Sequence, residues 1–528
     1  MTATTSLADY VPELQGENND WVEPPLRDYQ EQAVVAALAR GKAQIRIPPG
    51  SGKTHLGIAF AIRTGSPTVF VVDTIVLLDQ WKKNLADCGI DAGAWYGDDK
   101  DPKPMLLSTY QSLWQDPEIV HRYPTIIYDE GDRVTGDKFR AMLDELPHKR
   151  YALCLTATPP LDRERRELLD SAMPCVFEME EGEMEKRGWT VPVHLARVPV
   201  VMDAEEQREY DRILRECARW DGLIRSAFPR FEPGTLPMLS RFANEERAAA
   251  MEQALANSTA PCCIQKEGGP PHRHATVLWQ VWGEDLLHLC EGCAISMGKT
   301  GRPVRGGVAA IRAISAQLLR SWGDRQTAAS IVRAKGEALY RVVAKHPFQR
   351  VLVFTDRLDA FDRPFWLLER HHVPTRVISG ETPKTERKAI LEGWGSEYYV
   401  LGAAKVVERG FNVPDCGVVV VMGRVNAVQA KQKVGRGTRP AAGKTHCQAY
   451  AIYTEGTAEK SIPATIARVF KTMAGETWSP ISAAPRVEGE PKATHLLPPE
   501  ERRPPNRPKP SSAPPPPSPA SFQPASSL

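Results

Sequence analysis

The chain has 528 residues, of which 42% are hydrophobic and 25% are charged, and its formal net charge at pH 7 is +2. This length predicts several domains, and the composition is that of a globular protein. The near-neutral charge excludes a whole-protein field that attracts polyanions, so a nucleic-acid site has to be a local basic surface. No apolar run approaches the roughly 20 residues that span a bilayer.

The ends of the chain and its cysteines favour an intracellular, cytoplasmic protein. Residues 1–20 are polar and acidic, without the charged-then-apolar order of a secretory signal. Ten cysteines in a chain this long do not make a disulfide framework. We expect residues 1–22 to form a flexible arm and the protein to work in a reducing compartment.

The first chemical motif is a glycine-rich turn that follows a short apolar strand. Residues 43–47 read Ala-Gln-Ile-Arg-Ile, and residues 48–54 read Pro-Pro-Gly-Ser-Gly-Lys-Thr. Such a turn lets backbone N–H groups converge on phosphate, while Lys53 supplies charge and Thr54 can ligate Mg²⁺. Ile47 stands where the full pattern has its first glycine. The residues expected to surround the nucleotide phosphates are Pro49, Gly50, Ser51, Gly52, Lys53 and Thr54.

The second motif is a pair of carboxylates at the end of an apolar strand. Residues 125–128 are followed by Asp129-Glu130-Gly131-Asp132. Phosphoryl transfer to water needs one carboxylate to hold Mg²⁺ and another to orient the attacking water. Asp129 fits the metal role and Glu130 the water role. The alternative is a solvated acidic turn, which is common at strand ends.

Two further segments complete this set. Leu155-Thr156-Ala157-Thr158-Pro159 closes another apolar strand, and the hydroxyl groups of Thr156 and Thr158 could hydrogen-bond the acidic loop. Far downstream, residues 432–439 read Gln-Lys-Val-Gly-Arg-Gly-Thr-Arg. Planar guanidinium groups suit the charge on a transferring phosphoryl group, so Arg436 and Arg439 are catalytic candidates. Their alternative role is surface solubility.

The pattern along the chain predicts two α/β domains separated by a different kind of segment. In both blocks the strands are continuous apolar runs, as expected for parallel strands buried on both faces. We expect a first domain over residues 23–190, a helical linker with a Cys-rich insertion over 191–345, a second domain over 346–475 and a disordered Pro/Ser-rich tail over 476–528. The predicted strands are residues 43–47, 68–72, 105–107, 125–128 and 152–155, then 351–354, 375–378, 399–401 and 417–422. The predicted helices include residues 27–40, 309–319, 328–345 and one capped by Asp203 that runs through Trp220.

The Cys-rich insertion predicts a structural zinc site. Cys290 and Cys293 form a C-x-x-C turn, which supplies two ligands of a tetrahedral site. The remaining candidate ligands are Cys262, Cys263, His272 and His274. Buried thiols that bind nothing are the alternative. Zinc is favoured because the segment is rich in Gly and Pro and poor in core-forming residues.

Taken in order, these segments resemble the superfamily-two helicases and translocases, over roughly residues 24–190 and 346–460. Further segments carry the likeness: Leu26–Gln30 with Gln30 as the adenine contact, Ser108–Gln111 as a nucleic-acid loop, Phe354–Asp356 as the fourth motif and Ala404–Pro414, which includes Gly410, as the fifth. The resemblance implies two RecA-like domains with ATP and Mg²⁺ between them, Arg436 and Arg439 as arginine fingers, and a coupling role for Asp132, Thr156, Thr158 and Gln432.

Within that superfamily the segment around Val191–Val200 looks most like the xeroderma pigmentosum group B-type and restriction-subunit-type branch, which implies DNA in preference to RNA. Asp132 stands where that branch usually has His, and Gly131 where Ala, Cys or Val is more common. The expected function is an ATP-dependent helicase or translocase without a membrane partner, with protein partners possible through the tail. The alternatives are an ATP-switched nucleic-acid-binding regulator and the motor subunit of a restriction or repair nuclease.

Overall fold

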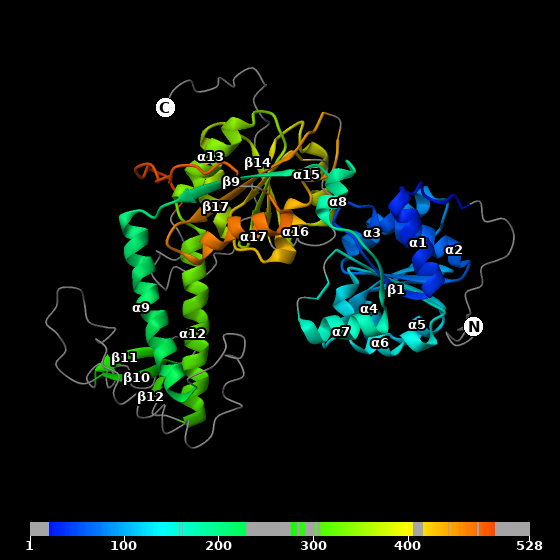
Figure 1. Ribbon diagram of the computed structural model, residues 1–528. Helices are drawn as coiled ribbons and strands as arrows, with labels where there is room; N and C mark the ends of the chain where they lie inside the picture. Colours follow the sequence, from blue (N-terminus) through cyan, green and yellow to red (C-terminus); the bar gives the residue numbers. More distant parts are fainter. Residues whose placement is uncertain are drawn as a thin grey trace, which may run out of the picture.

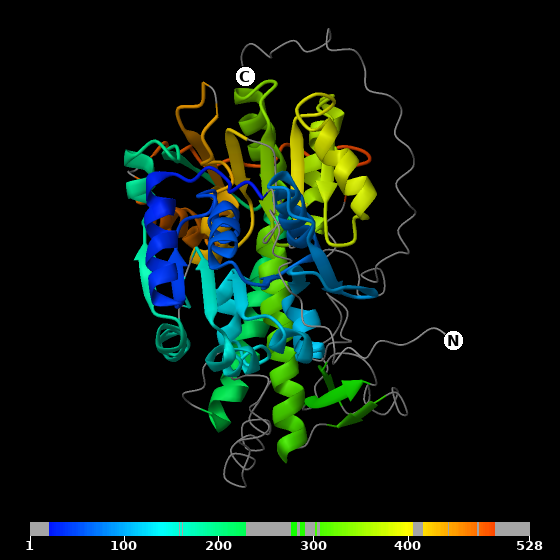
Figure 2. The same ribbon diagram turned by 90° about the vertical axis from the view of Figure 1, so that its right-hand side faces the viewer.

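The computed structural model describes residues 21–157, 159–160, 162–228, 276–281, 286–290, 301–303, 307–404, 416–441, 443–472 and 475–491. Figure 1 shows two α/β lobes side by side, with a long helical arm that extends from the second lobe. Figure 2, a quarter turn away, shows the same arm reaching past both lobes. Within these residues, the structure has no helix that combines the length and apolarity needed to cross a bilayer.

The first lobe contains an eight-stranded sheet in the order β4-β3-β5-β2-β6-β7-β1-β8. Its strands are β1 (Lys42–Arg46), β2 (Thr68–Val72), β3 (Gly93–Tyr96), β4 (Asp99–Asp101), β5 (Met105–Thr109), β6 (Thr125–Asp129), β7 (Tyr151–Thr156) and β8 (Cys175–Glu178). All neighbouring pairs are parallel except β3 and β4. The apolar runs predicted as buried parallel strands are therefore confirmed.

Helices cover both faces of this sheet, so the strands are buried on both sides. Successive residues of β2 show this directly, because Phe70 belongs to one core cluster and Val69 and Val71 to the other. Such two-sided burial explains why the strands read as unbroken apolar runs. The helical elements are α1 (Asp28–Arg40), α2 (Lys53–Thr64), α3 (Ile75–Asp87), α4 (Tyr110–Gln115), α5 (Glu118–His121), η2 (Gly131–Thr135), α6 (Ala141–Asp144), η3 (Leu146–His148), α7 (Arg163–Ala172) and α8 (Glu181–Lys186).

The second lobe contains a six-stranded, fully parallel sheet in the order β14-β15-β13-β16-β17-β9. Its strands are β9 (Val193–Val200), β13 (Val351–Thr355), β14 (Thr375–Ile378), β15 (Val400–Ala404), β16 (Val418–Val421) and β17 (Cys447–Thr454). The helical elements are α13 (Ala334–Lys345), η6 (Asp359–Phe361), α14 (Asp362–Arg370), α15 (Lys384–Gly393), α16 (Ala427–Val434), η8 (Ala458–Lys460) and α17 (Ser461–Phe470). The predicted fold class, two parallel α/β sheets with an inserted helical segment, is confirmed.

The division at residues 191 and 346 differs from the structure. Strand β9 pairs along its whole length with β17, and α13 packs on the same sheet. Both elements therefore belong to the second lobe and not to a linker. The sequence pattern concealed this because β9 and β17 are about 250 residues apart, and only tertiary pairing brings them together.

The arm consists of two long helices and a small antiparallel sheet. Helix α9 (Ala204–Ala227) begins at the predicted Asp203 cap, whose carboxylate accepts the N–H groups of Glu205 and Glu206. Helix α12 (Gly307–Ser330) packs against α9, and the sheet has the order β11-β10-β12 (Figure 1). Its strands are β10 (Thr276–Val281), β11 (Leu286–Cys290) and β12 (Gly301–Pro303).

Two helices are present where the sequence predicted them over 309–319 and 328–345, but the predicted break between them was wrong. Helix α12 continues through Gly323 to Ser330, and a new helix, α13, begins only at Ala334. The helix survives the glycine because the following turn, with Ala328 and Ala329, packs against Tyr210 of α9. Tertiary packing of this kind outweighs the roughly 1 kcal/mol helix penalty of one glycine.

Residues 475–491 form a strap along the edge of the second sheet, so the prediction that disorder starts at residue 476 was wrong. The strap hydrogen-bonds β9, since the N–H of Trp478 donates to the carbonyl of Arg197 at 2.9 Å and that of Ile481 to Pro199 at 3.0 Å. Ile481 is buried, and the Trp478 ring meets Tyr450 edge-on. The strap thereby covers an otherwise open edge strand. The predicted tail beyond residue 491 lies outside the described residues.

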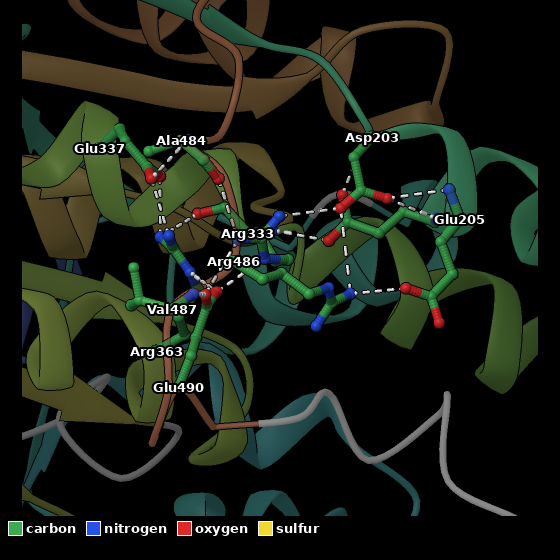
Figure 3. Close-up of polar contacts among 10 residues, drawn as sticks. Asp203, Glu205, Arg333, Glu337, Arg363, Ala484, Arg486, Val487 and Glu490 are labelled. Carbon is green, nitrogen blue, oxygen red and sulfur yellow. Dashed lines mark hydrogen bonds and ion pairs between the residues drawn. The ribbon is translucent and has the colours of Figure 1, made fainter.

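Figure 3 shows how the strap ends in a charged network at the base of the arm. The Glu490 carboxylate, whose side chain is 3% exposed, accepts hydrogen bonds at 2.6 Å from both Arg333 and Arg363. Arg333 also reaches Asp203 at 3.0 Å, so the network includes the first residue of the arm. Burial acts to raise the pKa of Glu490, but the hydrogen bonds and charges of the two arginines outweigh it and lower that pKa to about 2.

We predict that Glu490→Gln lowers the free energy of unfolding by about 3 kcal/mol at pH 7, because two buried guanidinium groups lose their shared carboxylate. The pKa is lowered on folding, so this stabilisation is present above pH 4.5, the ordinary value, and is lost as the pH falls toward about 2. Urea unfolding across this range measures the effect. The exposed neighbour Glu488 provides the control variant Glu488→Gln. Equal losses in the two variants would contradict the network.

Candidate active site

The phosphate loop joins β1 to α2 and has the backbone geometry that the motif requires. Gly50 and Gly52 both have φ of 78°, in the left-handed region that favours glycine. Gly52 caps α2, so Lys53 and Thr54 are its first two residues. Ile47 continues the pairing of β1 with β7, because its side chain is buried and its N–H donates to the Thr156 carbonyl at 3.0 Å. This explains why the chain needs no glycine there.

The first turn of α1 contacts the phosphate loop through two side chains. The hydroxyl of Tyr29 donates to the carbonyl of Ser51, and the Gln30 amide donates to Ser51 at 2.9 Å and to Gly52 at 3.2 Å. The Gln30 side-chain oxygen accepts the N–H of Arg27 at 2.8 Å. Gln30 was predicted from the resemblance to contact adenine. In this structure the Gln30 amide nitrogen binds the phosphate loop, and the amide oxygen binds Arg27, the N-cap of α1.

The acidic pair lies at the carboxyl end of β6, facing the loop lysine. The Asp129 carboxylate is buried and accepts the indole N–H of Trp81 at 2.9 Å and the N–H of Glu130 at 3.1 Å. The Glu130 carboxylate lies 3.9 Å from the Lys53 ammonium. Burial and then the charge of Glu130 raise the pKa of Asp129 to about 6, against the Lys53 charge and the two hydrogen bonds. Asp129, Glu130 and the Thr54 hydroxyl are hard oxygen donors of the kind that Mg²⁺ prefers.

The coupling candidate Thr156 lies at the end of β7, between the phosphate loop and the acidic pair. Strand β7 separates β1 from β6 in the sheet, so its end is placed beside both. The Thr156 hydroxyl reaches the Asp132 carboxylate at 3.4 Å, which is the contact expected between the Thr-rich turn and the acidic loop. Thr158 lies outside the described residues.

Gly131 has a steric explanation that the sequence did not reveal. A Cβ atom at this position would lie 2.5 Å from the Cys154 sulfur and 3.0 Å from the Cβ of Tyr128. The buried Cys154 side chain therefore occupies the space that a side chain at position 131 would need.

Arg439, from the second lobe, lies against the phosphate loop of the first lobe. If Gly50 carried a Cβ atom, that atom would lie 3.3 Å from the Cγ of Arg439. A Cβ atom on Gly435 would lie 3.4 Å from the Cβ of Pro49. Burial and then repulsion by Arg439 lower the pKa of Arg436 to about 10, while the charge of Glu130 acts to raise it. Arg439 therefore lies against the phosphate loop, and Arg436 interacts electrostatically with Arg439 and Glu130. About 390 residues separate Arg439 from Gly50 in sequence.

One contact in the cleft was missed by the sequence reasoning. The ammonium of Lys431, on α16, donates to the carbonyl of Ala157 at 2.7 Å and pairs with Glu181 at 2.9 Å. It therefore links the arginine segment to the Thr-rich turn. Its only signal was its position immediately before Gln432, which lies partly buried on the same helix.

Several predicted site residues cannot be placed. Gly410 and the zinc candidates Cys262, Cys263, His272, His274 and Cys293 lie outside the described residues, and Cys290 is placed only as the last residue of β11. Among the described residues, no group of three or more His, Cys, Asp or Glu is arranged to hold a metal ion. The zinc site therefore stays a prediction.

Comparison with known proteins gives two family matches, one for each lobe. The type III restriction enzyme res subunit matches residues 23–161, and the helicase conserved C-terminal domain matches residues 334–441. The "DNA 3'-5' translocase XPB2" of Sulfurisphaera tokodaii is 24% identical over 419 residues, which cover 78% of each chain. The chain belongs to superfamily two of the helicases and translocases.

A second relative with an XPB name and one solved structure were also found. The "DNA 3'-5' helicase XPB" of Mycobacterium tuberculosis is 29% identical over 198 residues, which cover 35% of this chain and only 36% of that relative. The helicase domain of Pyrococcus furiosus Hef aligns with a TM-score of 0.47 at 16% identity, over 83% of this chain and 97% of that domain. Superfamily membership implies ATP and Mg²⁺ as cofactors.

We predict that Gly131→Ala lowers the free energy of unfolding by about 1–3 kcal/mol, because the new methyl group overlaps the Cys154 sulfur. In a Cys154→Ala background the same change is expected to cost less, since the sulfur is gone. A double-mutant cycle measured by urea unfolding tests the coupling. Strict additivity of the two changes would show that Cys154 is not what requires glycine.

Proposed function

We propose that this protein is an ATP-dependent translocase or helicase that couples ATP hydrolysis to movement on DNA. The observation that carries the proposal is the packing of Arg439, from the second lobe, on Gly50 of the phosphate loop. With this contact the catalytic set spans two lobes. A nucleotide bound at the loop can thus bias how the lobes are arranged.

In the proposed reaction each side chain has one task. The loop N–H groups and Lys53 hold the β- and γ-phosphates, and Glu130 orients the attacking water and takes its proton. Arg436 and Arg439 stabilise the negative charge on the transferring phosphoryl group. Thr54 and Asp129 are the proposed holders of Mg²⁺, which supplies charge neutralisation at the phosphates when bound.

DNA is the proposed track because the relatives named above are a DNA translocase and a DNA helicase. Their names also give the 3'-5' direction, which is the polarity to test first. A change in the lobe arrangement would act through the inter-lobe contacts of Lys431, which touches the Thr-rich turn directly. We place this activity inside the cell, and protein partners for the predicted tail remain a prediction.

The alternatives make different demands on the site. A regulator that only switches on ATP needs neither a water-orienting carboxylate nor arginine fingers, and the candidates for both roles, Glu130, Arg436 and Arg439, argue against it. A nuclease subunit would need cleavage by a partner, because the sequence shows no clear nuclease motif. Turnover measurements decide the first alternative, and metal analysis of the purified protein decides the separate question of zinc.

We predict that Lys53→Ala and Glu130→Gln each abolish DNA-stimulated ATP hydrolysis, with a loss on the order of 10²–10⁴ for the carboxylate. Steady-state phosphate release with single-stranded DNA, duplex DNA, forked DNA and RNA measures both the rate and the preferred track. Glu130→Gln should retain ATP binding, because the amide keeps the size of the side chain and removes the proton acceptor and a negative charge that faces Lys53. Parent-like turnover in this variant would remove Glu130 from its proposed role.

We predict that Arg436→Ala lowers kcat by about 10³-fold or more while changing KM for ATP much less, since its charge acts on the transition state. The matched control is Arg370→Ala, which removes an exposed guanidinium from α14 on the same lobe. The same assay applies to both variants. An unaltered kcat in Arg436→Ala would assign that arginine to a structural role.

A further inference from the structure

A buried tyrosine hydroxyl reaches the backbone of the acidic pair. The hydroxyl of Tyr110 donates to the main-chain carbonyl of Asp129 at 2.9 Å, and Tyr110 is only 1% exposed. The proposed hydrolysis reaction does not use this hydrogen bond. A buried tyrosine needs a partner for its hydroxyl, but this partner is the peptide group that leads directly to Glu130.

That peptide group carries an unusual backbone. Glu130 has φ of 51° and ψ of 49°, a left-handed conformation that residues other than glycine adopt rarely. The peptide between Asp129 and Glu130 is held at both ends. Tyr110 binds its carbonyl, and the Asp129 carboxylate accepts its N–H at 3.1 Å. These two hydrogen bonds fix the orientation of the peptide group that precedes Glu130, whose carboxylate faces Lys53.

Tyr110 is itself fixed by the corner between β5 and α4. It is the first residue of α4, whose cap Thr109 accepts the N–H of Ser112 at 3.1 Å. Its ring packs against Tyr128 and Phe139, with centroids 6.1 Å and 5.6 Å away. A displacement of α4 therefore has to move the hydroxyl that holds the Asp129 carbonyl.

The same short helix carries an exposed aromatic, and a lysine from the segment between η2 and α6 lies against it. Trp114 is 46% exposed, and the ammonium of Lys138 lies 4.8 Å from its ring centroid. Lys138 also donates to the side chain of Gln111. An exposed indole beside an ammonium suits a nucleic-acid strand, because bases stack on aromatic rings and phosphates pair with cations.

We propose that Tyr110 is a positioning residue for Glu130, and that α4 transmits DNA binding at Trp114 and Lys138 to it. The inference rests on the proposed function, since it assumes a DNA-stimulated ATPase. DNA that contacts the outer side of α4 holds the helix in place, and the Tyr110 hydroxyl then keeps the Asp129–Glu130 peptide in the plane that hydrolysis needs. Hydrolysis is therefore fastest when the track is bound.

The test of the positioning role is Tyr110→Phe, which removes only the hydroxyl. The expected result is a fall in DNA-stimulated kcat on the order of tenfold, with KM for ATP and the affinity for DNA unchanged, because Lys53 and the outer face of α4 are untouched. The matched control is Tyr123→Phe in the same lobe. Tyr123 is also buried, and its hydroxyl donates to the Lys103 carbonyl at 2.8 Å, away from the acidic pair. Equal kinetic effects in the two variants would overturn the positioning role.

The test of the outer face uses surface changes that leave the core intact. Trp114→Ala and Lys138→Gln should each raise the single-stranded oligonucleotide concentration needed for half-maximal stimulation several-fold. The control Phe348→Ala removes an exposed aromatic from the second lobe and should leave that concentration unchanged. If neither Trp114→Ala nor Lys138→Gln changes it, DNA does not dock on α4. A parent protein without DNA stimulation would instead contradict the proposed function, so the two failures are distinguishable.

Discussion

The site depends on one close approach, that of the Arg439 side chain to Gly50 across the two lobes. A bound triphosphate concentrates negative charge, and charges delivered from a second body can make its hydrolysis sensitive to how the two bodies are arranged. The approach is possible because the loop has no side chain at Gly50 and takes a left-handed conformation there. A side chain at this position would be strained by the left-handed φ and would crowd the Arg439 side chain. In the proposed site the glycine therefore serves the contact between the lobes as well as phosphate binding.

Several hydrogen bonds and ion pairs connect the arm to the second lobe. On one side, Arg333 and Arg363 share Glu490 from the strap. On the other, the amide of Gln326, on α12, donates to Asp356 at 2.9 Å, and the Thr454 hydroxyl donates to the Ala329 carbonyl at 2.8 Å. The ends of β13 and β17 are thus tied to the arm. Charged groups buried this completely stabilise one arrangement only when every partner is present, which favours a single arm orientation.

Much of the architecture could be predicted from short-range patterns. The strands buried on both faces are continuous apolar runs in the sequence, and the Asp203 capping pattern predicted the start of α9. The failures share a cause. The pairing of β9 with β17, the continuity of α12 and the packing of the strap all depend on partners more than one hundred residues away in sequence. Lys431 escaped notice for the same reason, since its ammonium binds the carbonyl of Ala157, 274 residues away in sequence. The Tyr110 hydrogen bond spans only 19 residues, but its acceptor is a backbone carbonyl, which has no signature in the sequence.

The sequence by itself determined the chemistry: a glycine-rich loop with Lys53, a carboxylate pair after a strand, and arginines far downstream. These are properties of residue type and local spacing, so they can be read without coordinates. The tertiary structure decided which of them meet, because distances between lobes depend on sheet order and packing. It placed Arg439 on Gly50, put Cys154 where Gly131 lacks a side chain, and used a tyrosine hydroxyl to hold the backbone of Glu130. Contacts of that kind arise from the folded geometry, and no local pattern encodes them.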